Sequence, residues 1–369
     1  MSKPGADLAR RLASCLPEAE LHLERRFVDA AESDARAYDL PLRPVLQNLF
    51  VNRDALIVFL PIGAAVRLLA PVFAGKKRDA AVVCVDDGGR FAISVLSGHV
   101  GGGDDLARQV AAAIGAQPVV TSASDALNVT AIDLVGRAQG WRIDATSIDL
   151  TRAAAAVVNG EPVSLWLDTE TDAAWPDDQA MTDSITRVDK LTDALGDGYA
   201  ATLIVSDQIL TSDANHPVII YRPPTLVAGV GCRRGVEVEH LRGLLGDTLE
   251  QHGLTLQSLG KIATADIKAD EPGIIALAES LGVTLEVYTA SELNDRCAQA
   301  APLQGEGAGL SQPTPSAAQD LLGVFGVSEP AAMLAARADG LVVPRTKSDR
   351  ATVAVSRVAN RSSQSSGKI

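Results

Sequence analysis

The chain has 369 residues, of which 47% are hydrophobic and 21% are charged. This balance excludes a disordered chain and predicts a globular protein of two or three domains. The formal net charge of −13 and the lack of a clustered basic run argue against a nucleic-acid partner.

Aromatic residues make up only 4% of the chain, so aliphatic side chains must form a core of the kind that parallel sheets and covering helices share. The four cysteines are far apart and form no CxxC pair, which indicates reduced thiols and argues against a zinc or disulfide framework. No signal peptide is recognisable, and the longest apolar stretch, Ala55–Val66, is too short to span a bilayer. We therefore expect a cytoplasmic protein with no membrane partner.

The first predicted domain covers residues 1–130. Its opening segment "SKPGADLARRLASCL" predicts a turn and an amphipathic helix, with Leu8, Leu12 and Leu16 on one face. A doubly wound domain would place a strand ahead of that turn, so we expect the first strand to be missing. Four strands are predicted after the helix, the second and third joined by a "DDGG" hairpin turn. They are Ala55–Leu60, Ala80–Val85, Phe91–Leu96 and Gln117–Ser124.

The rest of the chain predicts two further domains and a tail. Residues 131–222 have weak signals, with one helix at "TRAAAAVVNG" and strands at "PVSLWL" and "ATLIVS", and we expect a small linking domain without chemistry. Residues 223–358 predict a second open α/β domain, interrupted by a mobile loop at 301–317, and residues 359–369 predict a disordered tail. The predicted class is α/β, with two Rossmann-like open domains joined by a small α/β middle domain.

The segment "SGHVGGGDD" lies between a predicted strand and a predicted helix, where open α/β sheets bind ligands. Glycines there let backbone N–H groups approach a ligand, and His99 could act as a general base. The simpler alternative is a tight turn in which Asp104 caps the helix. The two aspartates would repel a phosphate, which argues against a nucleotide site.

Three motifs in the last domain have a functional and a structural interpretation. "GVGCRRG" approximates a dinucleotide fingerprint with the wrong spacing; Arg233 and Arg234 could instead receive carboxylates or be solvated on a turn. Lys268, among the acids of "DIKADEPG", could polarise a ligand or pair with the acids, and Asp270 is expected to cap the following helix. Glu329 in "GVSEPAA" is expected at a helix start, where capping is the default role.

The segments "SVLSGHVGGGDDLA" and "TSASD" resemble the amino-terminal domain of the CbiG family, the cobalt-precorrin-5A hydrolases of cobalamin synthesis. "VAGVGCRRG", "KADEPGIIALAESLG" and "GVSEPAAMLAA" resemble that family's carboxy-terminal domain, which also occurs alone as CobE-type proteins. Gly103 and Asp104 depart from the alanine and asparagine usual after the family's glycine pair.

The resemblance implies a hydrolase that opens the δ-lactone of a cobalt-containing ring-contracting tetrapyrrole and releases acetaldehyde, giving cobalt-precorrin-5B. Such chemistry needs water activation, oxyanion stabilisation and a cleft that accepts many carboxylates. We expect the cleft between the two outer domains, with backbone donors of Ser97–Gly103 near the lactone and His99 as the base. The expected catalytic residues are His99, Ser97, Lys268 and Glu271. The expected substrate-binding residues are Gly98, Gly101, Gly102, Asp104, Arg67, Lys77, Thr121, Ser122, Asp125, Gly231, Cys232, Arg233, Arg234 and Glu329.

No protein-bound metal or cofactor is expected, because the cobalt belongs to the substrate. The expected partners are that tetrapyrrole, another cobalamin-pathway enzyme such as a precorrin methyltransferase, and a second copy in a homodimer. Two alternatives stay open: a non-catalytic CobE-like binder of corrinoid intermediates, and a nucleotide-dependent α/β enzyme. Acetaldehyde release would exclude the first, and the absence of stabilisation by NAD(P) or ATP would exclude the second.

Overall fold

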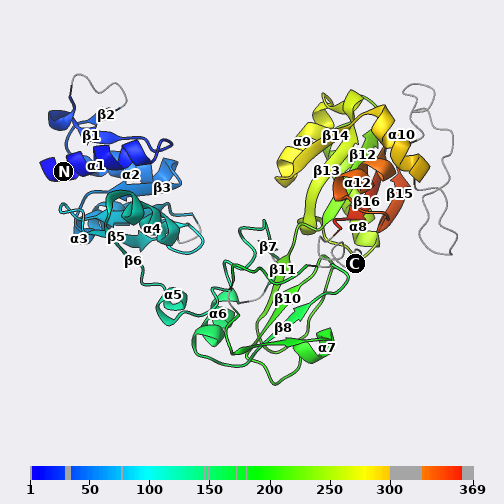
Figure 1. Ribbon diagram of the computed structural model, residues 1–369, viewed down its shortest axis with the longest axis horizontal. Coiled ribbons are helices and arrows are strands. Elements are labelled where there is room, and N and C mark those ends of the chain that lie inside the picture. Colours follow the sequence, from blue (N-terminus) through cyan, green and yellow to red (C-terminus); the bar gives the residue numbers. More distant parts are fainter. Residues whose placement is uncertain are drawn as a thin grey trace, which may run out of the picture. The chain divides into compact units, whose positions relative to one another are not determined.

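The computed structural model describes residues 2–29, 35–75, 78–144, 146–147, 149–171, 173–179, 181–299 and 326–359. The chain divides into a first unit, Met1–Leu134, and a second unit, Val135–Ile369 (Figure 1). Both units contain sheets of parallel or mixed strands flanked by helices, so the predicted α/β class is confirmed. The loop expected at 301–317 and residues 360–369 of the expected tail lie outside the described residues.

The main sheet of the first unit has the strand order β3-β4-β5-β6. The "DDGG" turn joins β4 and β5 as the predicted antiparallel hairpin, and the other two pairings are parallel. β4 is buried along its whole length, as its run of apolar residues requires. The strands are β3 (Ala55–Val58), β4 (Ala81–Val85), β5 (Phe91–Leu96) and β6 (Gln117–Val119), with a separate parallel pair of β1 (His22–Glu24) and β2 (Arg36–Tyr38).

Helices cover both faces of this sheet, and their apolar side chains form two clusters. One cluster joins α1 and α4 to the sheet through residues such as Leu12 and Val110. The other joins α2 and α3 through residues such as Leu46 and Leu69. The helices are α1 (Lys3–Cys15), α2 (Leu42–Asn52), α3 (Ile62–Leu69), α4 (Gly103–Ile114) and α5 (Ala123–Leu127).

The strand predicted over Gln117–Ser124 is too long. β6 ends at Val119, and the polar residues that follow lead into the short helix α5, which begins at Ala123. Serine and aspartate favour helix starts over strand interiors, which explains the difference.

The second unit begins with the sheet β7-β11-β10-β8-β9, in which only the pairing of β7 with β11 is antiparallel among the described strands. The strands predicted at "PVSLWL" and "ATLIVS" are confirmed as β8 and β10. The elements are β7 (Arg142–Ile143), α6 (Leu150–Val158), β8 (Val163–Leu167), β9 (Ile185–Val188), α7 (Leu191–Ala194), β10 (Ala201–Val205) and β11 (Val218–Arg222).

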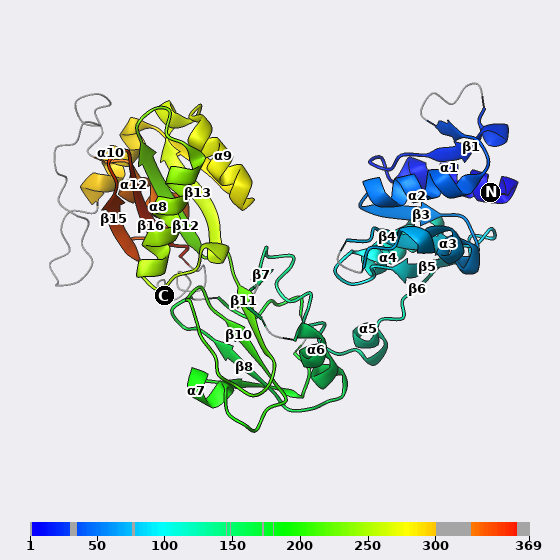
Figure 2. The same cartoon turned by 180° about the vertical axis from the view of Figure 1, so that it is seen from behind.

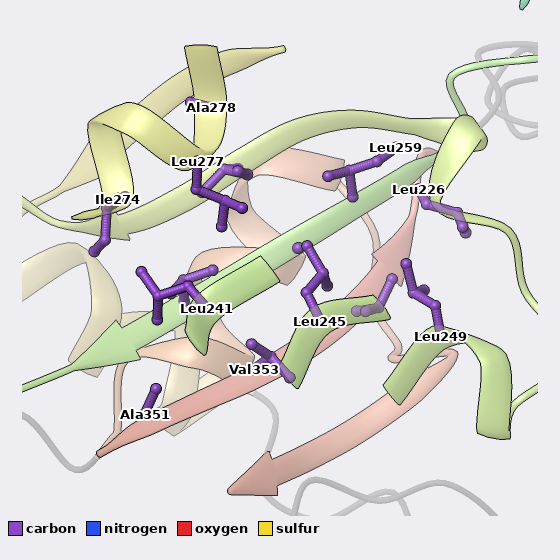
Figure 3. Close-up of a cluster of buried hydrophobic side chains, with 14 of the residues drawn as sticks. Leu226, Leu241, Leu245, Leu249, Leu259, Ile274, Leu277, Ala278, Ala351 and Val353 are labelled. Carbon is purple, nitrogen blue, oxygen red and sulfur yellow. The ribbon is translucent and has the colours of Figure 1, made fainter. Parts of the chain in front are cut away.

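A second sheet of this unit has the order β14-β13-β12-β16-β15, with β12, β13 and β14 parallel. Apolar side chains of α8 and α9 pack on one face (Figure 3), and those of α10 and α12 pack on the other (Figures 1 and 2). The elements are β12 (Leu226–Cys232), α8 (Val238–Gln251), β13 (Leu259–Ala265), α9 (Pro272–Leu281), β14 (Thr284–Tyr288), α10 (Ala290–Gln299), α12 (Ser328–Ala336), β15 (Val343–Lys347) and β16 (Ala351–Arg357).

An ion pair ties the two sheets of the second unit together. The guanidinium of Arg357, at the end of β16, donates to both carboxylate oxygens of Asp207 at 2.9 and 3.0 Å. Asp207 is fully buried and also accepts a hydrogen bond from Thr225. A buried carboxylate with three donors is well compensated, so this contact stabilises the junction between the two sheets.

None of the helices in the described part of the chain combines the length and apolar character needed to cross a bilayer.

Candidate functional site

The loop between β5 and α4 folds back on itself. Ser97 and Gly102 both have left-handed backbone conformations, with φ of 52° and 82°. The N–H groups of Gly102, Gly103 and Asp104 donate to the carbonyl oxygens of His99, Ser97 and Gly98 at 2.9, 3.0 and 2.9 Å. These bonds hold the loop closed, and those of Gly102 and Gly103 occupy two of the backbone donors that the sequence predicted for an oxyanion.

Two glycines of this loop are required by space. A Cβ atom on Gly101 would lie 2.4 Å from the Cβ of Ser97, and one on Gly98 would lie 2.5 Å from Asp104 Oδ1. Any side chain would push Asp104 or Ser97 out of place. The glycines therefore shape the loop that carries His99.

The His99 ring is held on both of its nitrogens. Nδ1 lies 3.2 Å from Asp133 Oδ1, and Nε2 lies 3.1 Å from the Ser124 hydroxyl. The side chain is 22% exposed, so one edge of the ring reaches solvent. An imidazole oriented by a carboxylate on one nitrogen and facing a hydroxyl with the other is arranged for proton transfer.

Two further carboxylates approach the same edge of the ring. Asp104 Oδ2 lies 3.7 Å and Asp125 Oδ2 lies 3.9 Å from His99 Nε2. The hydrogen bond with Asp133, followed by the charges of Asp133, Asp104 and Asp125, raises the pKa of His99 against the opposing effect of burial. Arg108 pairs with Asp125 and compensates part of the negative charge.

Asp104 is buried, and its Oδ2 atom has no hydrogen-bond partner among the described residues. The alternative role as helix cap is wrong, because the N-cap of α4 is Gly102 and receives no side-chain bond. The donor atoms of His99, Asp104 and Asp125 lie within 4.8 Å of one another, so these three residues could also hold a cation. The protonated imidazole of His99 can supply the same positive charge.

The other predicted residues of the first unit have different surroundings. The Ser97 hydroxyl donates to the carbonyl of Asp79 at 2.8 Å, and Ser122 donates to Asp125 Oδ2 at 2.7 Å. Thr121 is exposed beside this cluster. Arg67 is exposed on α3 and donates to the Gly63 carbonyl. Lys77 lies outside the described residues.

Sequence reasoning missed Asp133 and Ser124. Ser124 belongs to the "TSASD" segment, in which the sequence predicts Thr121, Ser122 and Asp125 as site residues. Asp133 is 34 residues from His99 and stands in "AIDLVG", where no motif marks it. Only the folded chain brings it to the ring.

In the second unit, Lys268 and Glu271 meet where β12 ends. Glu271 is 1% exposed; its Oε1 atom accepts from the Gly235 N–H at 2.7 Å, and its Oε2 atom lies 3.5 Å from Lys268 Nζ. Cys232 lies beside this pair, and burial raises the pKa of its thiol, while the Lys268 charge opposes the rise. The site therefore combines a half-buried neutral thiol with a compensated ion pair.

The two arginines of this loop are exposed. Arg234 pairs with Asp270 at 3.2 Å and donates to the Ile267 carbonyl at 3.2 Å, while the Arg233 backbone is held by the Arg350 carbonyl. The N-cap of α9 is Glu271, so the expectation that Asp270 caps this helix is wrong. Pro272 occupies the first helical position, which its fixed φ favours. The helix therefore begins one residue later than a cap at Asp270 would require.

Glycines on β12 serve close packing. A Cβ atom on Gly229 would lie 1.7 Å from the Ser328 carbonyl oxygen at the start of α12, and one on Gly231 would lie 2.8 Å from Thr352 Oγ1. Glu329 is buried in the first turn of α12, and its Oε1 atom accepts from the Arg345 N–H at 3.2 Å. The glycines that resemble a dinucleotide fingerprint are thus explained by close packing, at Gly229 against the start of α12 and at Gly231 against Thr352.

The fold and these sites define an α/β protein with an acid–histidine centre in one unit and, in the other, a strand-end loop that carries two exposed arginines. Three family profiles match the chain. Cobalamin synthesis G N-terminal covers residues 44–125, Cobalamin biosynthesis central region covers 130–223, and Cobalamin synthesis G C-terminus covers 226–356.

Relatives of known name agree with these profiles. A cobalt-precorrin-5A hydrolase of Priestia megaterium is 31% identical over 360 residues, 96% of this chain and 92% of the relative. A cobalt-precorrin-5A hydrolase of Salmonella typhimurium strain LT2 is 32% identical over 301 residues, 79% of this chain and 81% of the relative. Protein CobE of a Sinorhizobium species is 30% identical over 131 residues, 35% of this chain and 78% of the relative. The chain belongs to the CbiG family of cobalamin-synthesis proteins.

Proposed function

We propose that this chain is a cobalt-precorrin-5A hydrolase, which opens the δ-lactone of its tetrapyrrole substrate and releases acetaldehyde. The observation that carries this assignment is the match to two hydrolases of that name over most of both chains. The His99 centre supports it, because ester hydrolysis at neutral pH needs a positioned proton acceptor.

In this proposal the neutral form of His99 takes a proton from water through Nε2. Asp133 holds the proton on Nδ1, so that Nε2 presents its lone pair. The hydroxide equivalent attacks the lactone carbonyl, and the oxyanion forms near backbone N–H groups of the loop at Val100 and Gly101. The ester C–O bond then breaks, and the protonated His99 returns its proton to the leaving alkoxide oxygen. The alcohol so formed loses its proton as its C–C bond to the macrocycle breaks; the macrocycle keeps the electron pair of that bond and takes up a proton, and the two-carbon fragment leaves as acetaldehyde. Ser97 and Ser122 then have supporting roles, because their hydroxyls bond to Asp79 and Asp125.

The substrate's carboxylates need cations, and the second unit offers them at the end of β12. We assign carboxylate binding to Arg233 and Arg234, which are exposed and able to form bidentate contacts. Lys268 is 12% exposed and already paired with Glu271, so its contribution is a buried charge that orients the loop. Arg67 and Lys77, which the sequence predicts as substrate-binding residues, would add positive charge from the first unit.

Purified protein incubated with cobalt-precorrin-5A tests the assignment through acetaldehyde release. His99→Asn should reduce turnover by about 100-fold or more, since general-base catalysis contributes on that order. His22→Asn is the matched control, because His22 stands on β1 and bonds to Glu20, apart from the His99 centre. Normal turnover in His99→Asn would refute the catalytic role, and no acetaldehyde from wild-type protein would refute the function.

A second candidate is a non-catalytic binder of corrinoid intermediates, favoured by the partial match to Protein CobE. It predicts tight binding of the intermediate without acetaldehyde. The first unit, with its His99 centre, argues for catalysis.

We further propose that the enzyme needs no cofactor of its own, because the reaction is a hydrolysis and the cobalt enters with the substrate. The four free cysteines fit a reducing cytoplasm. Association with a precorrin methyltransferase and formation of a homodimer stay predictions from the sequence, which co-purification and size-exclusion chromatography would test.

A further inference from the structure

The first unit contains a slot of about 620 Å³, lined mostly by apolar residues, beside the edge of its main sheet. All four residues of β3 line it, together with Leu12 of α1, Leu46 of α2 and the start of β1 at Leu21 and His22. Residues of two helices and two strands thus surround one space. Small-molecule pockets can have this volume, so the elements that border the slot decide what it can hold.

In the described part of the chain, neither strand that borders the slot has a partner on that side. Among the described strands, β3 pairs only with β4 and β1 pairs only with β2. β3 is also less buried than its neighbour: Ala55 is exposed and Ile57 half-buried, whereas every residue of β4 is buried. Unpaired backbone N–H and C=O groups next to an apolar cavity are a site for strand addition.

The slot lies at the level of the sheet. Its wall includes Leu12 and Phe59 from the cluster under α1 and α4, and Leu46 and Leu56 from the cluster under α2 and α3. A filled slot would therefore be covered by helices on both faces. Strands advance ~3.3 Å per residue and lie ~4.8 Å apart in layers ~10 Å thick, so this volume corresponds to a strand of about four residues. β3 itself has four residues.

The ends of the flanking elements give the missing strand a direction. The Ser2 hydroxyl at the start of α1 donates to Asp87 Oδ1 at 2.6 Å, and a Cβ atom on Gly5 would lie 3.4 Å from the Cβ of Phe59. α1 therefore begins at the carboxyl ends of β3 and β4. Glu20 pairs with Arg53 at 2.9 Å, which brings the amino ends of β1 and β3 together.

We propose that this slot is the place of a further β-strand, joined to the amino end of α1 and lying parallel between β1 and β3. It would complete one sheet with the order β2-β1-strand-β3-β4-β5-β6 and connect to β1 through α1, as in other doubly wound folds. Because helices cover both faces, the strand must be apolar along its whole length. Residues that precede Met1 in the polypeptide made in the cell are the occupant that this geometry favours.

The test uses the full chain with two amino-terminal extensions ahead of Ser2. One carries the strand-forming segment Val-Ala-Ile-Val-Ala-Leu, and its matched control replaces the central Ile-Val with Pro-Pro, which cannot pair in a sheet. Hydrogen exchange at the amides of Leu56, Ile57 and Val58 reports pairing along β3. The apolar extension should slow this exchange by at least about tenfold and raise the melting temperature by several degrees, and the proline control should do neither.

Equal exchange in the two extended proteins would overturn the proposal. So would protection of β3 in the unextended chain that appears only with a dimer in size-exclusion chromatography, because a second copy would then occupy the edge. Intact-mass measurement on protein from its natural source gives an independent result. An apolar segment ahead of Met1 supports the proposal, and a mature chain that starts at Met1 or Ser2 contradicts it.

Discussion

Asp133 Oδ1 lies 3.2 Å from His99 Nδ1, although the two residues are 34 positions apart and belong to different loops. This contact fixes which nitrogen of the ring faces Ser124, Asp104 and Asp125. The hydrogen bond with Asp133 is also the largest cause of the raised pKa of His99.

Asp133→Asn should lower kcat/KM for acetaldehyde release by about 100-fold, because an amide neither fixes the His99 ring nor stabilises its charge as well. Asp7→Asn is the matched control: Asp7 is 61% exposed and pairs with Arg10 one turn away on α1. Equal activity of the two variants would show that Asp133 does not position the base.

The pH dependence of kcat/KM should follow the ionisation of His99. Its pKa is raised above the ordinary value of 6.5, so the inactive protonated ring persists to higher pH and activity should rise through an inflection above 6.5. Asp104, Asp125 and Asp133 face the ring, with Arg108 bound to Asp125. Asp133→Asn should move the inflection to lower pH, and an unchanged inflection would contradict this account.

The same raised pKa makes a stability prediction. The protonated ring is favoured in the folded state, so His99 stabilises the first unit below pH 6.5, and this contribution is lost as pH rises through the raised pKa. His99→Asn should remove this part of the pH dependence in urea unfolding. The same dependence in the variant would assign it to other groups.

Gly101→Ala should destabilise the first unit by about 1–3 kcal/mol, because the added Cβ would lie 2.4 Å from that of Ser97. Gly102→Asn is the control in the same loop: no atom lies within 4 Å of its Cβ position, and asparagine tolerates a φ of 82°. Thermal melting should separate the two variants. A loop that accepts both equally would show that Gly101 is not needed for space.

Glu271→Ala should destabilise the second unit by about 3 kcal/mol, since it leaves Lys268 unpaired in a largely buried position and removes the acceptor of the Gly235 N–H. Asp270→Ala, one residue away, removes only an exposed partner of Arg234 and should leave the melting temperature unchanged. If Glu271 acts mainly in chemistry, its variant would instead melt normally and lose turnover.

Arg222→Met should destabilise the second unit by about 3–5 kcal/mol, because it leaves Asp144 charged and buried. Burial alone would raise the pKa of Asp144, but hydrogen bonds from Thr146 and Arg222 outweigh it and lower the pKa. This stabilisation is present above the ordinary pKa of 3.8 and is lost as pH falls through the lowered value.

Urea unfolding at several pH values measures this effect. Arg152→Met is the control, because Arg152 is 69% exposed in its pair with Asp149. A similar loss of stability in both variants would show that burial of the Asp144–Arg222 pair is not the cause.

The sequence by itself determined much of the local structure. Apolar runs such as Ala81–Val85 can be stable only between helix layers, and the "DDGG" turn can only reverse the chain, so strands and hairpin were readable from local patterns. His99 was selected because glycine loops after strands are where open sheets carry ligands. The family too was readable, because its motifs are contiguous segments.

Only the tertiary structure decided which side chains meet. Asp133 reaches His99 through the path of the chain after α5, and Glu271, which follows β13, reaches Gly235 in the loop after the neighbouring β12. Neither contact has a local signature in the sequence. The approximate dinucleotide fingerprint also has a structural explanation that only the fold shows. α12 packs so closely on β12 that position 229 has no room for a side chain. The slot beside β3 also could not be predicted from the sequence. It is lined by residues of α1, α2, β1 and β3, which are far apart in the sequence and come together only in the fold.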